Sequence, residues 1–199
     1  MTRDELLDLY RRSGALLDGH FRLTSGLHSP GYLQCALVLQ HPRHAEAIGR
    51  AIADRVRELR ADVVLSPALG GVVIGQEVGR ALGVRAIFAE RQDGKLALRR
   101  GFTLATTDRV LVVEDVMTTG GSTRETIDVA KAAGGQVVGA ASIVDRSPSA
   151  GSGQAGTLRF DVPFTALLEI ALPTYEPDTC PLCAQGLPVV KPGSRPVAV

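Results

Sequence analysis

The chain has 199 residues and a formal net charge of +1, and 45% of it is hydrophobic although only 4% is aromatic. This length is enough for one domain with a substantial, mainly aliphatic core. The near-neutral charge gives no reason to expect general binding to nucleic acid or to a membrane surface. No apolar run reaches the roughly 20 residues of a membrane span. The polar N-terminus, Met-Thr-Arg-Asp-Glu, is unlike a signal peptide, so we expect a cytoplasmic protein.

The first third of the chain is expected to contain two helices separated by an extended segment. Residues 4–16 have the spacing of a short amphipathic helix, and residues 21–39 predict an extended segment interrupted by glycine and proline. Residues 43–59 predict a helix, because apolar side chains recur at intervals of four, four and three residues at Ile48, Ile52, Val56 and Leu59.

Strands and helices then alternate up to residue 144. The expected strands are residues 62–66, 84–89, 110–115 and 136–144, and the expected helices are residues 70–82 and 122–133. This alternation indicates an α/β fold with a right-handed, mainly parallel central sheet that is flanked by helices on both faces. Ligands in such sheets bind at the carboxyl ends of the strands.

The remaining segments are expected to be loops and one further strand. Residues 91–103 are charged and contain several glycines, which predicts a long loop or mobile hairpin, and residues 148–157 predict a flexible surface loop. Residues 163–171 are expected to form a strand that packs with the N-terminal segment. The chain is thus expected to be a single domain, made of a hood (residues 1–40 and about 160–175), a core (43–146) and a loose tail (186–199).

The stretch from residue 110 to 122 is the most informative part of the sequence. Residues 110–113 are an aliphatic run typical of a strand buried on both faces, and Glu114 and Asp115 follow at once. Adjacent carboxylates repel one another and are costly to bury unless something binds them. The Thr-Thr-Gly-Gly-Ser loop and the helix after it would present backbone N–H groups to a phosphate. These features indicate a sugar-phosphate site with a metal nearby, although acids that merely face water are the simpler alternative.

Residues 114–122 resemble the phosphoribosyl pyrophosphate (PRPP) motif of type I phosphoribosyltransferases. No Lys follows the glycines as in a nucleoside-triphosphate loop, and the dinucleotide fingerprint is absent. Four further regions resemble segments of the orotate phosphoribosyltransferases, in the same order, and they are residues 21–32, 66–71, 88–102 and 143–147. The resemblance covers about residues 1–175 and implies the type I phosphoribosyltransferase fold.

This resemblance implies an enzyme, a pentosyltransferase of de novo pyrimidine biosynthesis. It would transfer the ribose 5-phosphate group of PRPP to orotate and give orotidine 5′-monophosphate and pyrophosphate. The implied cofactor is Mg²⁺, held mainly through PRPP and water rather than by protein ligands. The implied PRPP-binding residues are Arg91, Lys95, Glu114, Asp115, Val116, Met117, Thr118, Thr119, Gly120, Gly121 and Ser122, joined by Thr123 and by the backbone of residues 69–71.

Within this set, residues 118–123 would hold the 5′-phosphate. Glu114 and Asp115 would bind the ribose hydroxyls and favour the positive charge that builds up on the ring as pyrophosphate leaves. Lys95 and Asp115 are the implied catalytic residues, and Lys95 would stabilise the leaving group or assist proton transfer.

Orotate is planar and anionic, so its site needs a cation. Arg146 is the best candidate, because a guanidinium matches a carboxylate in a bidentate manner, and Thr118 is a second contact by resemblance. From the residues alone, an exposed Arg146 that pairs with Asp145 remains an open alternative.

Positive charge is dense between residues 91 and 100, at Arg91, Lys95, Arg99 and Arg100. These side chains belong either to a solvated loop or to a lid that closes over pyrophosphate and excludes water. By resemblance, the lid would reach the site of a neighbouring subunit, which implies a homodimer.

The sequence departs from the family pattern at several positions. Thr24 and Gly70 stand where some relatives have Lys, and Ala36 replaces a basic residue found in others. No His follows His44, so no histidine of the lid can take part in catalysis. The core PRPP motif is unaffected by these departures.

The three cysteines, Cys35, Cys180 and Cys183, are too few for a disulfide framework. Cys180-Pro-Leu-Cys183 has the spacing of half a zinc site, but the sequence offers no second Cys-x-x-Cys and no His pair near it. We therefore expect a reduced surface turn, with a zinc site shared between two subunits as the alternative. His20 and His28, in the hood, are expected to be satisfied polar residues rather than catalysts.

Two other functions fit parts of the sequence. A purine phosphoribosyltransferase would share the PRPP motif, but a neutral base gives no reason for Arg146. A regulator that senses PRPP and binds nucleic acid would need a basic face or an added domain, which the charge of +1 disfavours.

Overall fold

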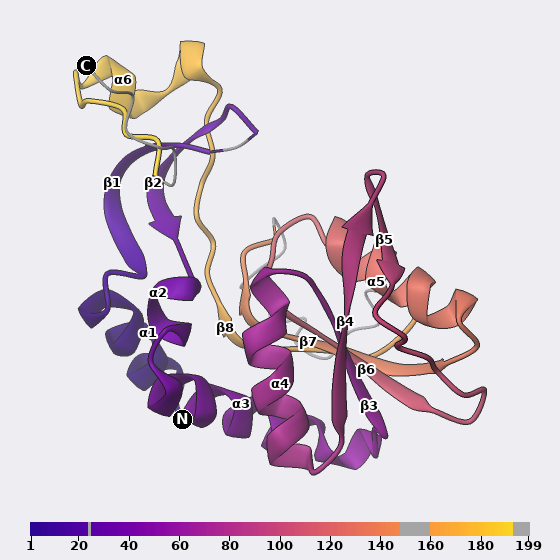
Figure 1. Ribbon diagram of the computed structural model, residues 1–199. Helices are drawn as coiled ribbons and strands as arrows, with labels where there is room; N and C mark the ends of the chain where they lie inside the picture. Colours follow the sequence, from indigo (N-terminus) through magenta and orange to yellow (C-terminus); the bar gives the residue numbers. More distant parts are fainter. Residues whose placement is uncertain (24, 148–159, 193–199) are drawn as a thin grey trace.

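The centre of the molecule is a six-stranded sheet with the strand order β5-β4-β3-β6-β7-β8 (Figure 1). A computed structural model describes residues 1–23, 25–147 and 160–192. Neighbouring strands pair in parallel, except that β5 forms an antiparallel hairpin with β4. The predicted α/β class and mainly parallel sheet are therefore confirmed. The strands are β3 (Val63–Pro67), β4 (Arg85–Gln92), β5 (Lys95–Leu98), β6 (Arg109–Met117), β7 (Gln136–Asp145) and β8 (Phe164–Glu169).

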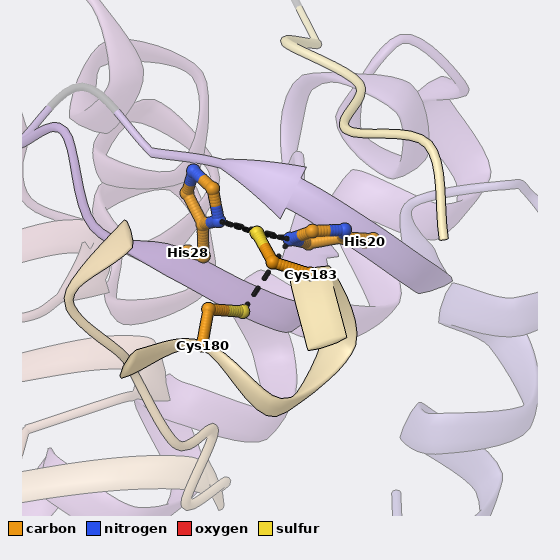
Figure 2. A group of neighbouring side chains, drawn as sticks. All are labelled: His20, His28, Cys180 and Cys183. Atoms are coloured by element: carbon orange, nitrogen blue, oxygen red, sulfur yellow. Dashed lines mark hydrogen bonds between the residues drawn. The ribbon is translucent and has the colours of Figure 1, made fainter. Parts of the chain in front are cut away.

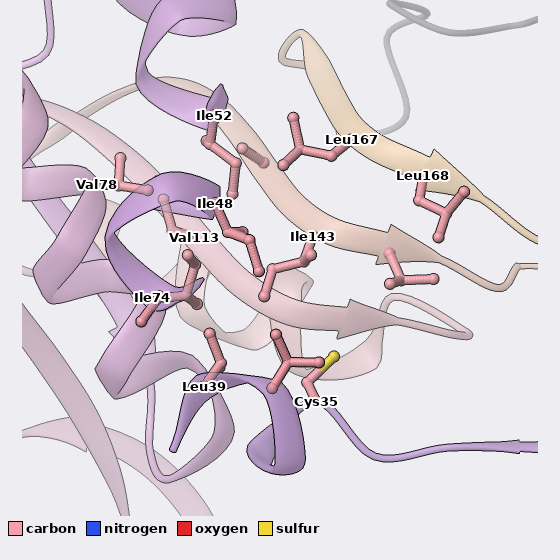
Figure 3. Close-up of a cluster of buried hydrophobic side chains, with 14 of the residues drawn as sticks. Cys35, Leu39, Ile48, Ile52, Ile74, Val78, Val113, Ile143, Leu167 and Leu168 are labelled. Atoms are coloured by element: carbon pink, nitrogen blue, oxygen red, sulfur yellow. The ribbon is translucent and has the colours of Figure 1, made fainter. Parts of the chain in front are cut away.

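Helices cover both faces of this sheet. The buried residues of α3 (Pro42–Val56) and α4 (Gly70–Leu82) share one core, and those of α5 (Gly121–Ala132) lie in the cores on the other face. Successive residues of β6 alternate between the faces. Leu111 and Val113 join the core of α3 and α4, in which Figure 3 labels Val113, and Val112 belongs to the core that includes Ile127 of α5. This two-sided burial explains why the strand is an unbroken aliphatic run.

A separate antiparallel hairpin of β1 (Leu16–Arg22) and β2 (His28–Leu33) follows α1 (Arg3–Arg12) and precedes α2 (Ala36–Leu39). The C-terminal segment contains the 3₁₀ turn η2 (Pro177–Thr179) and α6 (Pro181–Ala184). It pairs with both edges of the hairpin, through Tyr175 with His28 and through Val190 with Phe21. Figure 1 shows the hairpin and α6 together at one end of the molecule, apart from the central sheet. We call residues 16–33 and 175–190 together the hood.

The structure differs from the sequence predictions in how the C-terminal part is placed. Residues 163–171 were expected to form a strand that packs with the N-terminal segment in the hood. The strand is present as β8 and contacts α1, but it pairs in parallel with β7 at the edge of the main sheet and not with the β1–β2 hairpin. The hood is completed by the later segment around Tyr175 and Val190, so the start of the expected loose tail is paired. The loop predicted at 148–157 and residues 193–199 lie outside the described residues.

Smaller differences follow from local backbone conformation. The first helix ends at Arg12, short of residue 16, and Gly14 adopts a left-handed φ of 67° just before β1. The extended segment expected at 21–39 is a hairpin that starts earlier, at Leu16, and its last four residues are helical. The charged stretch after residue 91 begins as the β4–β5 hairpin, with a two-residue turn at Asp93 and Gly94, both at positive φ. None of the helices in the described part of the chain combines the length and apolarity needed to cross a bilayer.

The crossing of α3 and α4 generates a prediction about stability. A Cβ on Gly49 would lie 2.6 Å from Cβ of Glu77 and 2.8 Å from its carbonyl carbon, so Gly49→Ala must push the two helices apart. Because the added Cβ meets backbone as well as side-chain atoms, we expect a crowding cost of about 2–3 kcal/mol, and the better helix propensity of Ala returns about 1 kcal/mol. We expect urea denaturation to show a net loss of about 1–2 kcal/mol. Arg50→Ala, on the exposed side of the same helix, should change stability by less than about 0.5 kcal/mol; equal stability of Gly49→Ala and wild type would contradict the tight crossing.

Candidate active site

The residues of the predicted PRPP motif lie at the carboxyl end of β6. The strand continues to Met117, so Glu114 and Asp115 lie within its last four residues rather than after its end. The backbone N–H of Arg146 donates to the carbonyl oxygen of Met117 at 2.7 Å, which brings the end of β7 beside the end of β6. The loop of Thr118 and Thr119, both exposed, then leads into α5.

Glu114 is held by the first turn of α5. Thr123 is buried and donates a short hydrogen bond from its hydroxyl to the Glu114 carboxylate. Burial raises the pKa of Glu114 from its ordinary 4.5 to about 7; the bond from Thr123 opposes this shift and the charge of neighbouring Asp115 adds to it. The free protein therefore holds a carboxyl group that is partly protonated near neutral pH.

Asp115 lies against the start of α4, on the other side of β6. A Cβ on Gly70 would be 2.7 Å from an oxygen of the Asp115 carboxylate, so the absence of a side chain at Gly70 is what lets this carboxylate lie here. Burial raises the pKa of Asp115, although hydrogen bonds from backbone N–H groups oppose the shift. Behind the strand, the Cys35 thiol lies 3.9 Å from the Asp115 carbonyl oxygen and 3.0 Å from the Tyr10 hydroxyl.

Two helix N-termini therefore begin next to the two acids. Helix α5 starts after Gly120, which has a left-handed φ of 78° and no side chain with which to cap the helix. A Cβ on Gly120 would also lie 2.9 Å from the Phe160 ring, so both the positive φ and the lack of space favour glycine at this position. Helix α4 starts at Gly70, after an exposed Leu69. Uncapped N–H groups at helix starts are donors for an anion.

Arg146 lies partly buried just after β7. Its Nε is buried and has no hydrogen-bond partner among the described residues. Burial lowers the pKa of its guanidinium, and the nearby Tyr32 of the hood opposes that shift. The sequence left open an exposed Arg146. The structure instead shows a half-buried guanidinium whose Nε–H has no acceptor among the described residues. Such a donor is costly unless an acceptor is supplied, which favours an anionic ligand at this position.

The β4–β5 hairpin carries the predicted lid residues, and acidic partners already engage most of its arginines. Arg91 pairs with Glu125 of α5 at 3.1 Å, and Arg99 and Arg100 pair with Glu90 at 3.3 and 2.9 Å. Lys95, at the exposed start of β5, forms no ion pair with any residue in the described ranges. Thr24, one of the departures from the family pattern, falls outside these ranges.

Sequence reasoning missed the acids that organise this hairpin. Glu125 accepts the backbone N–H of Leu96 at 2.7 Å as well as binding Arg91, so it anchors the hairpin to α5. Its position four residues after Gly121, in the first exposed turn of the expected helix, was the available signal. The pairing itself joins segments more than 30 residues apart and could not be read from local pattern.

The cysteine prediction was wrong in part: the thiols are free, as expected, but they do not both lie in a surface turn. Cys180 is buried rather than part of a surface turn, and only Cys183 is exposed. His20 and His28, which are distant in sequence, lie beside both thiols (Figure 2).

Comparison with known proteins agrees with this geometry. Residues 36–161 match the phosphoribosyl transferase domain. An orotate phosphoribosyltransferase of Desulforamulus reducens is 50% identical over 197 residues, covering 99% of this chain and all of the relative, and one of Heliobacterium modesticaldum is 52% identical over 98% and 100%. A crystal structure of the Mycobacterium tuberculosis orotate phosphoribosyltransferase in complex with PRPP is 28% identical, with a TM-score of 0.63, and covers 83% of this chain and 94% of that one.

The chain therefore belongs to the phosphoribosyltransferase family, with the type I fold. Since the relatives that match it over its full length at about half identity are orotate phosphoribosyltransferases, it falls in that branch of the family rather than with the purine enzymes or the regulators.

The environment of Glu114 generates a prediction about titration. We expect carbon-13 NMR of glutamate-labelled protein to give a carboxyl pKa of about 7 for Glu114, and a higher value in Thr123→Val, which loses the bond that lowers it. Glu125, whose pKa is lowered mainly by the Leu96 N–H, is the internal control. The pKa of Glu114 is higher in the folded protein than its unfolded value of about 4.5. The contribution of Glu114 to the free energy of unfolding is therefore complete below about pH 4.5 and is lost as the pH rises through about 7. A pKa near 4.5 in the folded protein would contradict the buried environment.

Proposed function

We propose that the chain transfers the ribose 5-phosphate group of PRPP to orotate, giving orotidine 5′-monophosphate and pyrophosphate, in pyrimidine biosynthesis. The observation that carries this proposal is the buried Nε of Arg146, which has no hydrogen-bond partner in the part of the chain that the structure describes and lies beside the end of the strand that bears Glu114 and Asp115. One edge of the sheet thus offers a cation for an anionic base next to two carboxylates for a ribose.

The acids and the two helix N-termini are proposed to bind different parts of PRPP. The loop from Thr118 to Gly121 and the uncapped start of α5 supply hydroxyl and N–H donors for the 5′-phosphate. Glu114 and Asp115 accept hydrogen bonds from the ribose hydroxyls. The backbone around Gly70 faces the 1′-pyrophosphate, because it lies on the opposite side of Asp115 from α5.

The raised pKa values of the two acids give them a further role. Substrate binding brings hydroxyl donors, and the developing positive charge of the ring then favours the ionised form of Glu114 and Asp115. This set fits Mg²⁺ held through PRPP and water, since a hydrated ion needs only outer contacts from carboxylates. When bound, Mg²⁺ neutralises charge on the leaving pyrophosphate.

Orotate is proposed to lie between Arg146 and the hood. The guanidinium would bind the orotate carboxylate, with Thr118 as the second contact. Tyr32, whose ring packs against Phe21 at 5.8 Å, lies near Arg146 and would close the base site from the hood side.

The β4–β5 hairpin is proposed as the lid. Glu125 of α5 contacts Arg91 and Leu96, a strand pair one step from the turn, so the end of the hairpin near its turn is docked on α5. Lys95, beside the turn, is exposed and would reach a pyrophosphate from outside. Lys95 would then act on the leaving group, and Arg91 would bind PRPP after exchange from Glu125. A homodimer in which each lid serves the neighbouring site, and a cytoplasmic location, stay predictions.

The reaction is tested with an ultraviolet assay of the purified protein. We expect orotate to be consumed only when both PRPP and Mg²⁺ are present. Consumption of a purine base in place of orotate would contradict the base assignment while leaving the PRPP site intact.

The role of Arg146 is tested in the same assay. Arg146→Gln removes two charge-assisted hydrogen bonds and should raise KM for orotate on the order of 100-fold, with KM for PRPP within about threefold of wild type. Arg146→Lys keeps the charge but not the planar fork, so it should restore only part of the affinity. A rise in KM for PRPP alone would move Arg146 out of the base site.

The shared lid is tested by mixing two inactive variants. Lys95→Ala and Asp115→Asn should each lower kcat at least about 100-fold with the fold intact. If the lid acts across a dimer, refolding them together should restore about a quarter of wild-type activity, because half of randomly formed dimers are mixed and each mixed dimer has one complete site. No recovery in a mixture shown to exchange subunits would place Lys95 in its own subunit's site.

A further inference from the structure

Four side chains that can bind a metal converge in the hood, from segments about 160 residues apart (Figure 2). His20 and His28 come from β1 and β2, and Cys180 and Cys183 come from the start of α6. Their ligand atoms all lie within 4.8 Å of one another. His20, His28 and Cys180 are at most 6% exposed, so the cluster is built into the hood rather than placed on its surface.

Four of the six distances between ligand atoms of the cluster are close to those of a tetrahedron around one zinc ion, and the other two are at most 4.8 Å. Zinc bonds of about 2.3 Å to sulfur and 2.0–2.1 Å to nitrogen imply about 3.6 Å between a sulfur and a nitrogen ligand and about 3.4 Å between two nitrogens. The sulfur–nitrogen distances are 3.5 Å from Cys180 to His20, 3.8 Å from Cys183 to His20 and 3.3 Å from Cys183 to His28. The two ring nitrogens, 2.9 Å apart, need to separate by only about half an ångström.

Hydrogen bonding alone leaves these groups in conflict. Nδ1 of His20 lies 2.8 Å from the carbonyl oxygen of Leu187, and a carbonyl can only accept, so Nδ1 carries the proton. Nε2 of a neutral His20 is then a lone pair, yet it is approached by His28 Nδ1 and by both thiols. Either Nδ1 of His28 is protonated and competes with the two thiols for this lone pair, or it is a second lone pair that faces the first at 2.9 Å. A cation would use all four ligand atoms at once.

The bond from His20 to Leu187 is also the outer contact that a metal-bound histidine needs. It fixes the ring orientation and the tautomer with Nε2 free, and it increases the basicity of that nitrogen. Two thiolates would neutralise the two positive charges of the ion, so the occupied site adds no net charge to the hood.

We propose that His20, His28, Cys180 and Cys183 bind a structural Zn²⁺. Four protein ligands in a tetrahedral two-sulfur, two-nitrogen set leave no open position for a substrate, and this combination is typical of structural zinc. The sequence suggested half a site because Cys180 and Cys183 are separated by only two residues. The same chain supplies the two histidines that complete the site, so no second subunit is needed.

The ion would fasten the C-terminal segment to the hairpin. Backbone pairs already join the two at Tyr175 and Val190, and the cluster lies between these two bridges in sequence. Phe21 follows His20 directly and packs on Tyr32, which lies near Arg146. The metal would thus hold the hood in the position from which it covers the base, as a positioning element that touches no substrate.

The proposal is tested first by metal analysis of the wild-type protein. We expect inductively coupled plasma mass spectrometry to find about one zinc per chain. After removal with a chelator and dithiothreitol, the protein should take up about one Zn²⁺, and Co²⁺ in its place should give the visible absorption of a tetrahedral thiolate site. Absence of zinc uptake, a different metal at stoichiometric level, or octahedral cobalt would overturn the assignment. A Cys180–Cys183 disulfide that persists after reduction and reconstitution would do the same.

Ligand variants locate the ion without relying on activity. Cys183→Ser and His28→Gln should lose at least about nine-tenths of the bound zinc, while His41→Gln, an exposed histidine outside the cluster, should keep it. Zinc that remains in both ligand variants would overturn the proposal. If a variant fails to fold, the chelated wild-type protein supplies the readout: amide hydrogen exchange should accelerate in residues 16–33 and 175–190 and stay unchanged in β3 and β6. Unchanged exchange in the hood would count against a structural role.

The expected thermal effect is modest, because the central sheet does not depend on the ion. Chelation should lower the Tm of the hood transition by about 5–10 °C, and zinc, but not Mg²⁺, should reverse the shift. The effect on the reaction should appear as a higher KM for orotate with little change in kcat, and this arm alone rests on the proposed function.

Discussion

The constraint on which the site depends is the placement of two adjacent carboxylates on β6, a strand in the middle of the sheet. The ladder of β6 with β3 ends at Val112, but its ladder with β7 continues through Glu114 to Met117, so the backbone that carries the two acids is held in place by β7. Their burial raises the pKa of both groups, which means that the protein surroundings alone disfavour the ionised state of these acids. A ligand that brings hydroxyl donors and positive charge offsets the cost of burying these carboxylates. This gain forms part of the free energy of binding.

The neighbours of these acids follow from the same constraint. Thr123, in the first turn of α5, must be small and must donate, and Gly70, at the start of α4, must have no side chain. The two helices that begin here are therefore fixed to the acids before any phosphate binds. On the proposed function, this arrangement would let one short edge of the sheet present donors to two phosphates and acceptors to the sugar between them.

Much of this arrangement could be predicted from the sequence, because it is local. The strands β3, β6 and β7 are aliphatic runs, the helices that follow β3 and β6 start at glycines, and the acids occur at the end of the β6 run. The identity of Arg146 and the lid residues came from resemblance, and their roles stay predictions. Long-range pairing could not be predicted. The residues of β8 form a strand pattern that fits either the main sheet or the hood, so the pattern does not identify its partner strand. The contacts of Glu125 with Arg91 and of His20 with Cys180 likewise have no local signal in the sequence.

The hood and the core are stable for different reasons. The core buries a sheet between helices, so its stability comes from a large apolar area. The hood is a two-stranded hairpin with a short C-terminal segment across it, and an isolated hairpin is at best marginally stable in water. Its buried residues include His20 and His28, polar groups that a small apolar core would exclude. A hood that must hold Tyr32 near Arg146 therefore needs some fastening other than apolar burial, and the His–Cys cluster is the feature of the described hood that can provide it.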